Sequence, residues 1–184
     1  VEKYAKSIGR SHVRGPVNPT MDDGAGFQLN AYDTTPYIMM IQNPPEYPQF
    51  AETAGYSKVK DLYAFRLVSS IGISDKIKKL AERVRKRTEF SIRPLNMKDY
   101  DNEVQRVLDF YNEEWEANWG HIKYSEKQAR LLAKQLKLIV DPELILFMEI
   151  NGEIIGVGMG FPDANQMLKK IKDGHLIPFG IIPF

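Results

Sequence analysis

The sequence contains no cysteine. This absence excludes a disulfide-stapled scaffold, a cysteine-ligated zinc site and a catalytic thiol. No apolar run approaches the roughly 18 residues that a membrane-spanning helix needs. Residues 1–9 read as part of a charged amphipathic helix and not as a signal peptide. We therefore expect a soluble, cytoplasmic protein without a membrane partner.

The net charge is also small. The chain has 25 Lys and Arg residues against 24 Asp and Glu residues, which gives a net charge of +1 at pH 7. Such a balance gives no overall attraction to nucleic acid, and we expect no nucleic-acid partner. The motifs HExxH, the P-loop and Gly-x-Ser-x-Gly are missing. Apolar residues make up 43% of the 184 residues, enough for a packed core in one large or two small domains.

Residues 144–161 contain two apolar runs on either side of Asn151-Gly152. This dipeptide readily adopts positive φ at both centres of a type I′ turn, so the pattern predicts a β-hairpin. Neither run alternates cleanly, which predicts a hairpin covered on both faces. Gly156, Gly158 and Gly160 recur at a spacing of two and would admit a helix or a ligand close to the backbone. A helix is the commoner reason for such a stripe.

Residues 74–87 place Ile77, Leu80, Ala81 and Val84 at helical spacing after Ser74, a suitable N-cap. Seven Lys and Arg residues cover the rest of this segment. The basic face suits a solvated linker helix or a polyanion such as nucleic acid. A solvated linker is favoured because no nucleic-acid motif accompanies the segment.

Two further amphipathic helices are predicted at residues 100–118 and 125–139. In the first, Trp115 continues the apolar face and is expected in the core. Shorter helices are expected at residues 1–9, 46–54 and 164–172. Strands are expected at residues 10–14, 56–68, 90–94 and 176–184, and residues 37–41 form a short apolar run.

The order strand, two helices and hairpin over residues 90–161 resembles the N-terminal half of the GNAT superfamily of acetyl-CoA-dependent N-acetyltransferases. The residues that fit are Phe90 to Asp99 (FSIRPLNMKD) and Phe147 to Gly156 (FMEINGEIIG). Residues 1–68 resemble the C-terminal half of the same fold through Gly15-Pro-Val-Asn18, the helix from Tyr47 to Ala54, and Ala54-Gly-Tyr-Ser-Lys58. The whole pattern is similar to bacterial proteins with tandem GNAT-like units.

This resemblance implies an α/β (α+β) fold with a GNAT-like mixed central sheet flanked by helices. It divides the chain into residues 1–70, the back half of one unit, a basic linker helix at 71–89, and residues 90–184, the front half of the next. The two halves would dock into one composite domain, with Ile177–Phe184 and Arg10–Arg14 as adjacent parallel strands. In the alternative, each half is completed by sequence outside this chain or by a second copy in a homo-oligomer.

The resemblance also implies acetyl-CoA as cofactor and acyl transfer to a small-molecule amine. The family's pyrophosphate loop, Arg/Gln-x-x-Gly-x-Gly/Ala, does not occur in these residues, so no cofactor-binding residue is assigned. Ala51 occupies the position of the family's general-acid tyrosine. Glu149 is the candidate general base, although a structural strand residue is the favoured reading. The alternative function is a non-catalytic GNAT-like module that binds a small ligand or mediates assembly.

The resemblance places the amine pocket at the junction of the first two helices. The candidate substrate-binding residues are polar or polar-tipped aromatic side chains that suit a small amine or amide, namely Asn18, Tyr47, Asn118, Trp119 and Tyr124. No metal site is expected.

Overall fold

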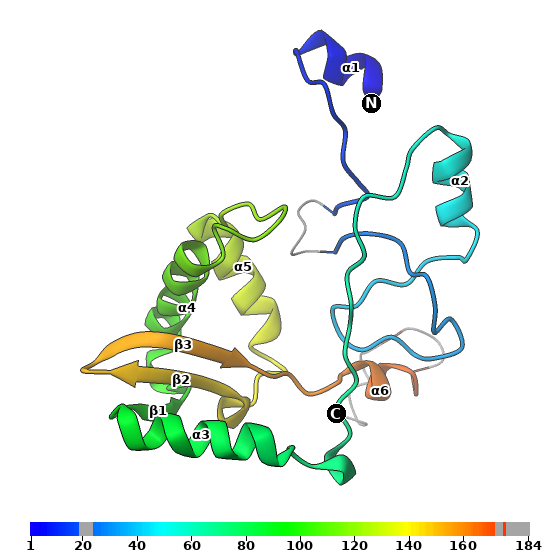
Figure 1. The fold of residues 1–184 in the computed structure, drawn as a ribbon. Helices are drawn as coiled ribbons and strands as arrows, with labels where there is room; N and C mark the ends of the chain where they lie inside the picture. Colours follow the sequence, from blue (N-terminus) through cyan, green and yellow to red (C-terminus); the bar gives the residue numbers. More distant parts are fainter. Residues whose placement is uncertain (19–23, 172–174, 176–184) are drawn as a thin grey trace. The chain divides into compact units, whose positions relative to one another are not determined.

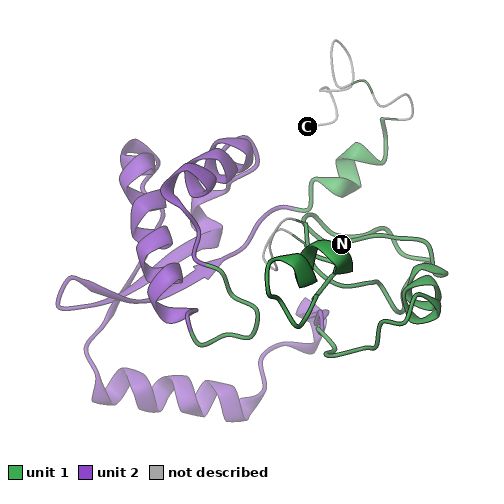
Figure 2. Ribbon diagram, turned by 90° about the horizontal axis from the view of Figure 1, so that it is seen from above, with its two compact units in different colours: residues 1–62, 117–122, 163–184 green, residues 63–116, 123–162 purple. Residues whose placement is uncertain are grey.

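The computed structural model describes residues 1–18, 24–171 and 175, and the chain divides into two compact units (Figures 1 and 2). Unit 1 comprises residues 1–62, 117–122 and 163–184, and unit 2 comprises residues 63–116 and 123–162. Both helices and strands occur among the described residues, so the chain is a mixed α/β protein.

Unit 2 contains an antiparallel sheet in the order β1 (Ser91–Pro94), β2 (Ile145–Ile150) and β3 (Glu153–Met159). The turn between β2 and β3 has φ values of 52° at Asn151 and 82° at Gly152. Positive φ at both central residues is the type I′ geometry that this dipeptide favours. The predicted hairpin is confirmed.

Two helices, α4 (Tyr100–Glu114) and α5 (Glu126–Leu136), cover one face of this sheet (Figure 1). Phe147 and Ile145 point from β2 into the core beneath the helices. A capping box between Ser125 and Gln128 begins α5. Both helices are shorter than predicted, since α4 ends at Glu114 and α5 at Leu136. The core of unit 2 is small and consists of the buried residues Leu95, Tyr100, Leu108, Ile145 and Phe147.

The opposite face of the sheet is open among the described residues. Leu146 is 40% exposed, and Ile92, which neighbours β2 on the same face, is 52% exposed. A Cβ atom built at Gly158 would meet nothing within 4 Å. The expectation that a helix packs on the glycine stripe is therefore wrong for the part of the chain that the structure describes. Coverage of both faces was predicted because the apolar runs lack clean alternation. Burial of a sheet face depends instead on whether helices or other segments pack against it.

The basic segment forms α3 (Asp75–Arg87), and the Ser74 hydroxyl accepts a hydrogen bond from the Ile77 backbone N–H. The predicted helix and its N-cap are confirmed. A short 3-10 turn, η1 (Ser69–Ile71), precedes it.

The described residues of unit 1 form three short helices, α1 (Glu2–Ser7), α2 (Tyr47–Thr53) and α6 (Asn165–Leu168), joined by loops. Residues distant in sequence are tied together around α6. The Asp163 carboxylate accepts a hydrogen bond from the Ile38 backbone N–H at 3.1 Å. The Asn165 amide donates to the Pro36 carbonyl at 2.8 Å. These side chains replace backbone pairing as the link between residues 35–38 and 163–169.

The strands expected at residues 10–14 and 56–68 are wrong, because these residues form loops. Alternating apolar residues stabilise a strand only when a neighbouring strand pairs with it, and no such neighbour is present among the described residues. The helix expected at residues 164–172 is shorter than expected, because only α6 is formed there. The expected strand at 176–184 lies outside the described residues, so the composite domain and its tandem halves stay a prediction. No helix of the described chain is long and apolar enough to span a membrane.

Candidate functional site

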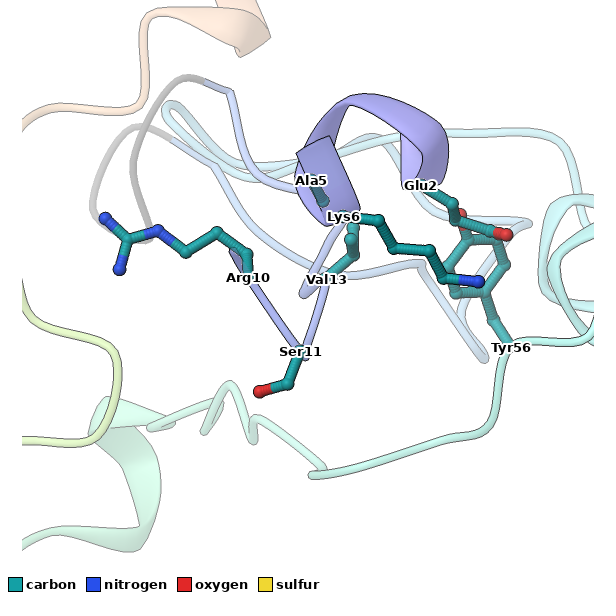
Figure 3. A pocket seen from close by; sticks show the side chains of 7 residues that line it. All are labelled: Glu2, Ala5, Lys6, Arg10, Ser11, Val13 and Tyr56. Carbon is teal, nitrogen blue, oxygen red and sulfur yellow. The ribbon is translucent and has the colours of Figure 1, made fainter. Parts of the chain in front are cut away.

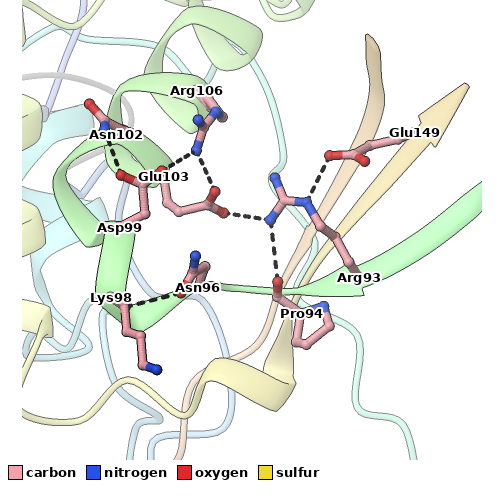
Figure 4. Close-up of polar contacts among 9 residues, drawn as sticks. All are labelled: Arg93, Pro94, Asn96, Lys98, Asp99, Asn102, Glu103, Arg106 and Glu149. Atoms are coloured by element: carbon pink, nitrogen blue, oxygen red, sulfur yellow. Dashed lines mark hydrogen bonds and ion pairs between the residues drawn. The ribbon is translucent and has the colours of Figure 1, made fainter. Parts of the chain in front are cut away.

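A charged cluster joins the covered face of the sheet to α4 in unit 2 (Figure 4). Arg93 on β1 donates through Nε to the Glu149 carboxylate and through Nη1 to the Glu103 carboxylate, each at 2.8 Å. Its guanidinium also lies over the Phe147 ring, 4.4 Å from the centroid. Glu103 is only 2% exposed. Arg93 therefore bridges two carboxylates while packing on the core.

The cluster continues along α4 through Arg106, which contacts both Glu103 and Asp99. The hydrogen bond to Glu103, followed by the one to Glu149, raises the pKa of Arg93 against the opposing effect of partial burial. Hydrogen bonds from Arg106 and then Asn102 lower the pKa of Asp99. These shifts favour the charged forms, and the cluster behaves as a fixed ion network.

Glu149, the candidate general base, lies on β2 inside this network. Its Oε1 accepts a charge-assisted hydrogen bond from Arg93 Nε, and its side chain is only 19% exposed. The contacts of Glu149 fit the structural role that we favoured for it from the sequence. A catalytic role for Glu149 stays a prediction.

Trp119, a candidate substrate-binding residue, lies in unit 1 beneath two cations. The Arg14 guanidinium carbon is 4.5 Å from the centroid of the Trp119 ring system, and the Lys60 ammonium is 5.2 Å from it. These distances fall within the range of cation–π attraction. The half-buried indole and the exposed cations form a positively charged aromatic surface, which we call the Trp119 site (Arg14, Lys60 and Trp119).

The other candidate binding residues are distributed over both units. Asn118 lies beside Trp119, and its carbonyl accepts a hydrogen bond from the His121 backbone N–H. Tyr47 begins α2 and contacts the rings of Phe27 and Phe50. Asn18 is exposed at the end of a loop, where its backbone N–H donates to the Gly24 carbonyl. Among the described residues, no side-chain hydrogen bond or ring contact joins Asn18, Tyr47 or Asn118 to the Trp119 site.

Tyr124 belongs to unit 2, where Asn112 of α4 holds its backbone with two hydrogen bonds of 2.8 and 2.9 Å. Its ring meets the edge of Tyr111, which stacks in turn on Trp115 at 5.3 Å. Trp115 is 44% exposed, so its predicted place in the core is wrong. Since α4 ends at Glu114, Trp115 is the helix cap and no longer follows the apolar face.

A small open pocket of about 220 Å³ lies beside α1 in unit 1 (Figure 3). Its lining combines Glu2, Lys6 and Tyr56 with Arg10 and Ser11. A hydrogen bond to Glu2 raises the pKa of Tyr56. The pocket has both polar and apolar lining, and none of the expected site residues lines it.

Within residues 1–18, 24–171 and 175, no group of three or more His, Asp or Glu side chains is arranged to hold a metal ion. Sequence reasoning missed Arg14, Lys60, Arg93 and Glu103. The sequence does contain a signal for Glu103, because this charged residue interrupts the inward face of a helix between Tyr100 and Val104. The sequence contains no such signal for Arg14 and Lys60, because residues that meet through loops do not recur at a regular spacing.

Comparison with known proteins gives two relatives that match nearly the whole chain. The chain is 34% identical over 182 residues to a bacterial ceramide synthase of Caulobacter vibrioides (strain NA1000 / CB15N), covering 97% of this chain and 46% of that protein. It is 31% identical over 180 residues to the protein YghO of Escherichia coli (strain K12), covering 97% and 45%. The chain therefore spans less than half the length of these curated relatives. No family model matches the chain, and no solved structure matches it.

Proposed function

We propose that this chain is the amine-acceptor part of a GNAT-like N-acyltransferase, a bacterial, cytoplasmic enzyme that joins an acyl group to an amino group. The observation that supports this most directly is the arrangement of unit 2, where β1, α4, α5, β2 and β3 follow one another in the order that suggested the resemblance. The open, glycine-lined face of the hairpin leaves room for a flat ligand.

The name of one relative supports the same chemistry. A ceramide is the amide of a fatty acid with a long-chain amino alcohol, so a ceramide synthase forms an N-acyl bond. We therefore propose the amino group of a long-chain amino alcohol as the acyl acceptor.

The described residues do not fit the pyrophosphate of acetyl-CoA. Such a group needs free backbone N–H groups at a helix N-terminus. Ser74 and Ser125 cap the N-termini of α3 and α5, and the uncapped first turn of α4 contains the acids Asp101 and Glu103, which would repel a phosphate. We assign no cofactor contact to this chain, and in our proposal the acyl donor binds elsewhere in the enzyme.

The Trp119 site offers a specific contribution to the acceptor side. An amine attacks only as the neutral base, and a neighbouring positive charge disfavours its ammonium form. An amino group bound beside Arg14 and Lys60 would therefore have a lowered pKa. The indole supplies an apolar surface for the adjoining hydrocarbon chain.

A non-catalytic GNAT-like module, which binds a small ligand or mediates assembly as a homo-oligomer, is the second candidate. Two observations favour it: the missing pyrophosphate loop, and the engagement of Glu149 by Arg93. In this alternative the ligand binds and no amide forms.

Product analysis separates the two candidates. The full-length protein is incubated with a long-chain amino alcohol such as sphinganine and a fatty acyl-CoA, and the amide is measured by mass spectrometry. We expect enzyme-dependent amide that requires both substrates. The second candidate predicts saturable binding of the amino alcohol with amide formation no faster than in a protein-free control.

A further inference from the structure

The helix α3 has an apolar stripe that nothing in the described chain covers. None of its residues is buried, and no described helix or strand packs along its length (Figure 1). Ile77 and Leu80 are each 57% exposed, and Val84 is 39% exposed. Exposed apolar side chains gathered on one face mark an interaction surface.

The chain just before α3 extends this apolar surface. Leu67 is 93% exposed, Ile71 in η1 is 81% exposed, and Ile73 is 62% exposed. Apolar groups therefore run from residue 67 into the stripe of α3. A linker helix facing only water would have no physical need for them.

The charges of α3 are arranged around the stripe in a specific way. With about 100° between successive residues, Lys76, Arg83 and Arg87 flank one side of the stripe. Lys78 and Arg85 flank the other side. The two acids, Asp75 and Glu82, lie on the far side of the helix together with Lys79 and Lys86, and Asp75 pairs with Lys78 at 3.6 Å. Cations thus border the apolar stripe on both sides, and the negative charge faces away from it.

We infer that α3 docks on an anionic lipid surface, lying in the plane of the membrane interface with Ile77, Leu80 and Val84 inserted. An apolar stripe bordered by Lys and Arg is the pattern of helices that bind at this interface. The long side chains at its borders can extend to lipid phosphates while their stems cover apolar surface. Charge complementarity selects anionic lipid.

The apolar stripe favours lipid over nucleic acid. Phosphate backbones attract Lys and Arg without using an aliphatic surface, and here the aliphatic residues form the centre of the patch. This inference departs from the expectation, drawn from the sequence, of a solvated linker without a membrane partner. It rests on the exposure of α3 and not on the proposed acyl transfer.

Vesicle flotation tests the inference. The full-length protein is mixed with vesicles of phosphatidylcholine alone or of an equimolar mixture of phosphatidylcholine and phosphatidylglycerol. We expect flotation with the anionic vesicles only, weakened by salt. The double variant Ile77→Gln/Leu80→Gln should weaken binding at least about tenfold. Removal of one flanking cation, in Lys76→Gln, should weaken it about fivefold.

The matched control is Glu82→Gln, which removes a charge from the far side of α3 and should bind at least as tightly as the unmodified protein. Far-UV circular dichroism checks that each variant keeps its helix, and Leu80→Ala replaces the double variant if that one unfolds. The inference is overturned if the anionic vesicles are not bound, or if the apolar variants bind as tightly as the unmodified protein. It is also overturned if the apolar variants convert a dimer to a monomer, which would assign the stripe to a second copy.

Discussion

Glu103 offers the sharpest test of the ion network in unit 2. The variant Glu103→Gln keeps the shape of the side chain and removes its charge from a site that is 2% exposed. Arg93 would then keep Glu149, and Arg106 would keep Asp99, but both would lose their shared central partner.

The expected loss of stability follows from the exposure of the partners. Breaking a fully buried ion pair by removing one member costs about 3–5 kcal/mol. The Arg93 and Arg106 side chains are 32% and 42% exposed, so water compensates part of their lost partner. We therefore expect a loss of about 2 kcal/mol, within the usual range for one or two charge-assisted hydrogen bonds.

Urea denaturation measures this loss, provided that the signal comes from unit 2. Since the chain has two units, a single global transition is not assured. Trp115 lies in unit 2, and its fluorescence can be isolated in a Trp119→Phe background. Glu113→Gln, on the exposed face of α4, is the matched control and should change stability by less than about 0.5 kcal/mol.

A double-mutant cycle confirms the partner. Arg93→Met should destabilise less in the Glu103→Gln background than alone, with a coupling of about 1 kcal/mol or more. If Glu103→Gln unfolds at the same urea concentration as Glu113→Gln, the reasoning about the buried carboxylate is refuted.

Local signals made part of this fold predictable from sequence. Asn151-Gly152 specifies its turn through backbone conformation alone, and Ser74 and Ser125 mark helix starts through caps that need only neighbouring residues. Residues 56–68 show strand-like alternation as well, but a strand requires a distant pairing partner that a local pattern does not reveal. The end of α4 was predicted too late, which misplaced Trp115.

The candidate site was less predictable because its contacts are long-range. Trp119 was singled out as a polar-tipped aromatic residue, but its cations come from two loops remote in sequence, at Arg14 and Lys60. Arg93 meets Glu103 across a strand and a helix, and neither residue belongs to a motif. Such pairings become visible only once the sheet and α4 are assembled.

Three further predictions concern the charges of α3, the pairing of Asp99 with Arg106, and the missing pyrophosphate loop for acetyl-CoA. Replacing Lys78, Lys79 and Arg83 together with Gln should change the free energy of unfolding by less than about 0.5 kcal/mol per residue, because all three are exposed. Urea denaturation measures this change. A larger loss would mean that this face is buried against a partner. Because Arg106 lowers the pKa of Asp99 in the folded state, their pairing stabilises the fold above the ordinary value of 3.8 and is lost as the pH falls through the lowered pKa. NMR titration should find the Asp99 pKa raised by Arg106→Gln and unchanged by Arg130→Gln, and an unmoved value in the first variant would contradict the pairing. Isothermal titration of this chain with acetyl-CoA should give no saturable heat, whereas micromolar binding would contradict the missing phosphate cradle.

The kinetics of Trp119-site variants test the proposed acceptor role most directly. In the full-length protein, Trp119→Leu should raise the KM for the amino alcohol about tenfold, because the indole supplies its apolar contact. Lys60→Gln should shift the pH–rate profile to higher pH, because the bound amine regains a higher pKa. Trp115→Leu, the matched control, should leave both unchanged. If Trp119→Leu and Lys60→Gln behave like Trp115→Leu in both KM and pH profile, the Trp119 site does not bind the acceptor amine.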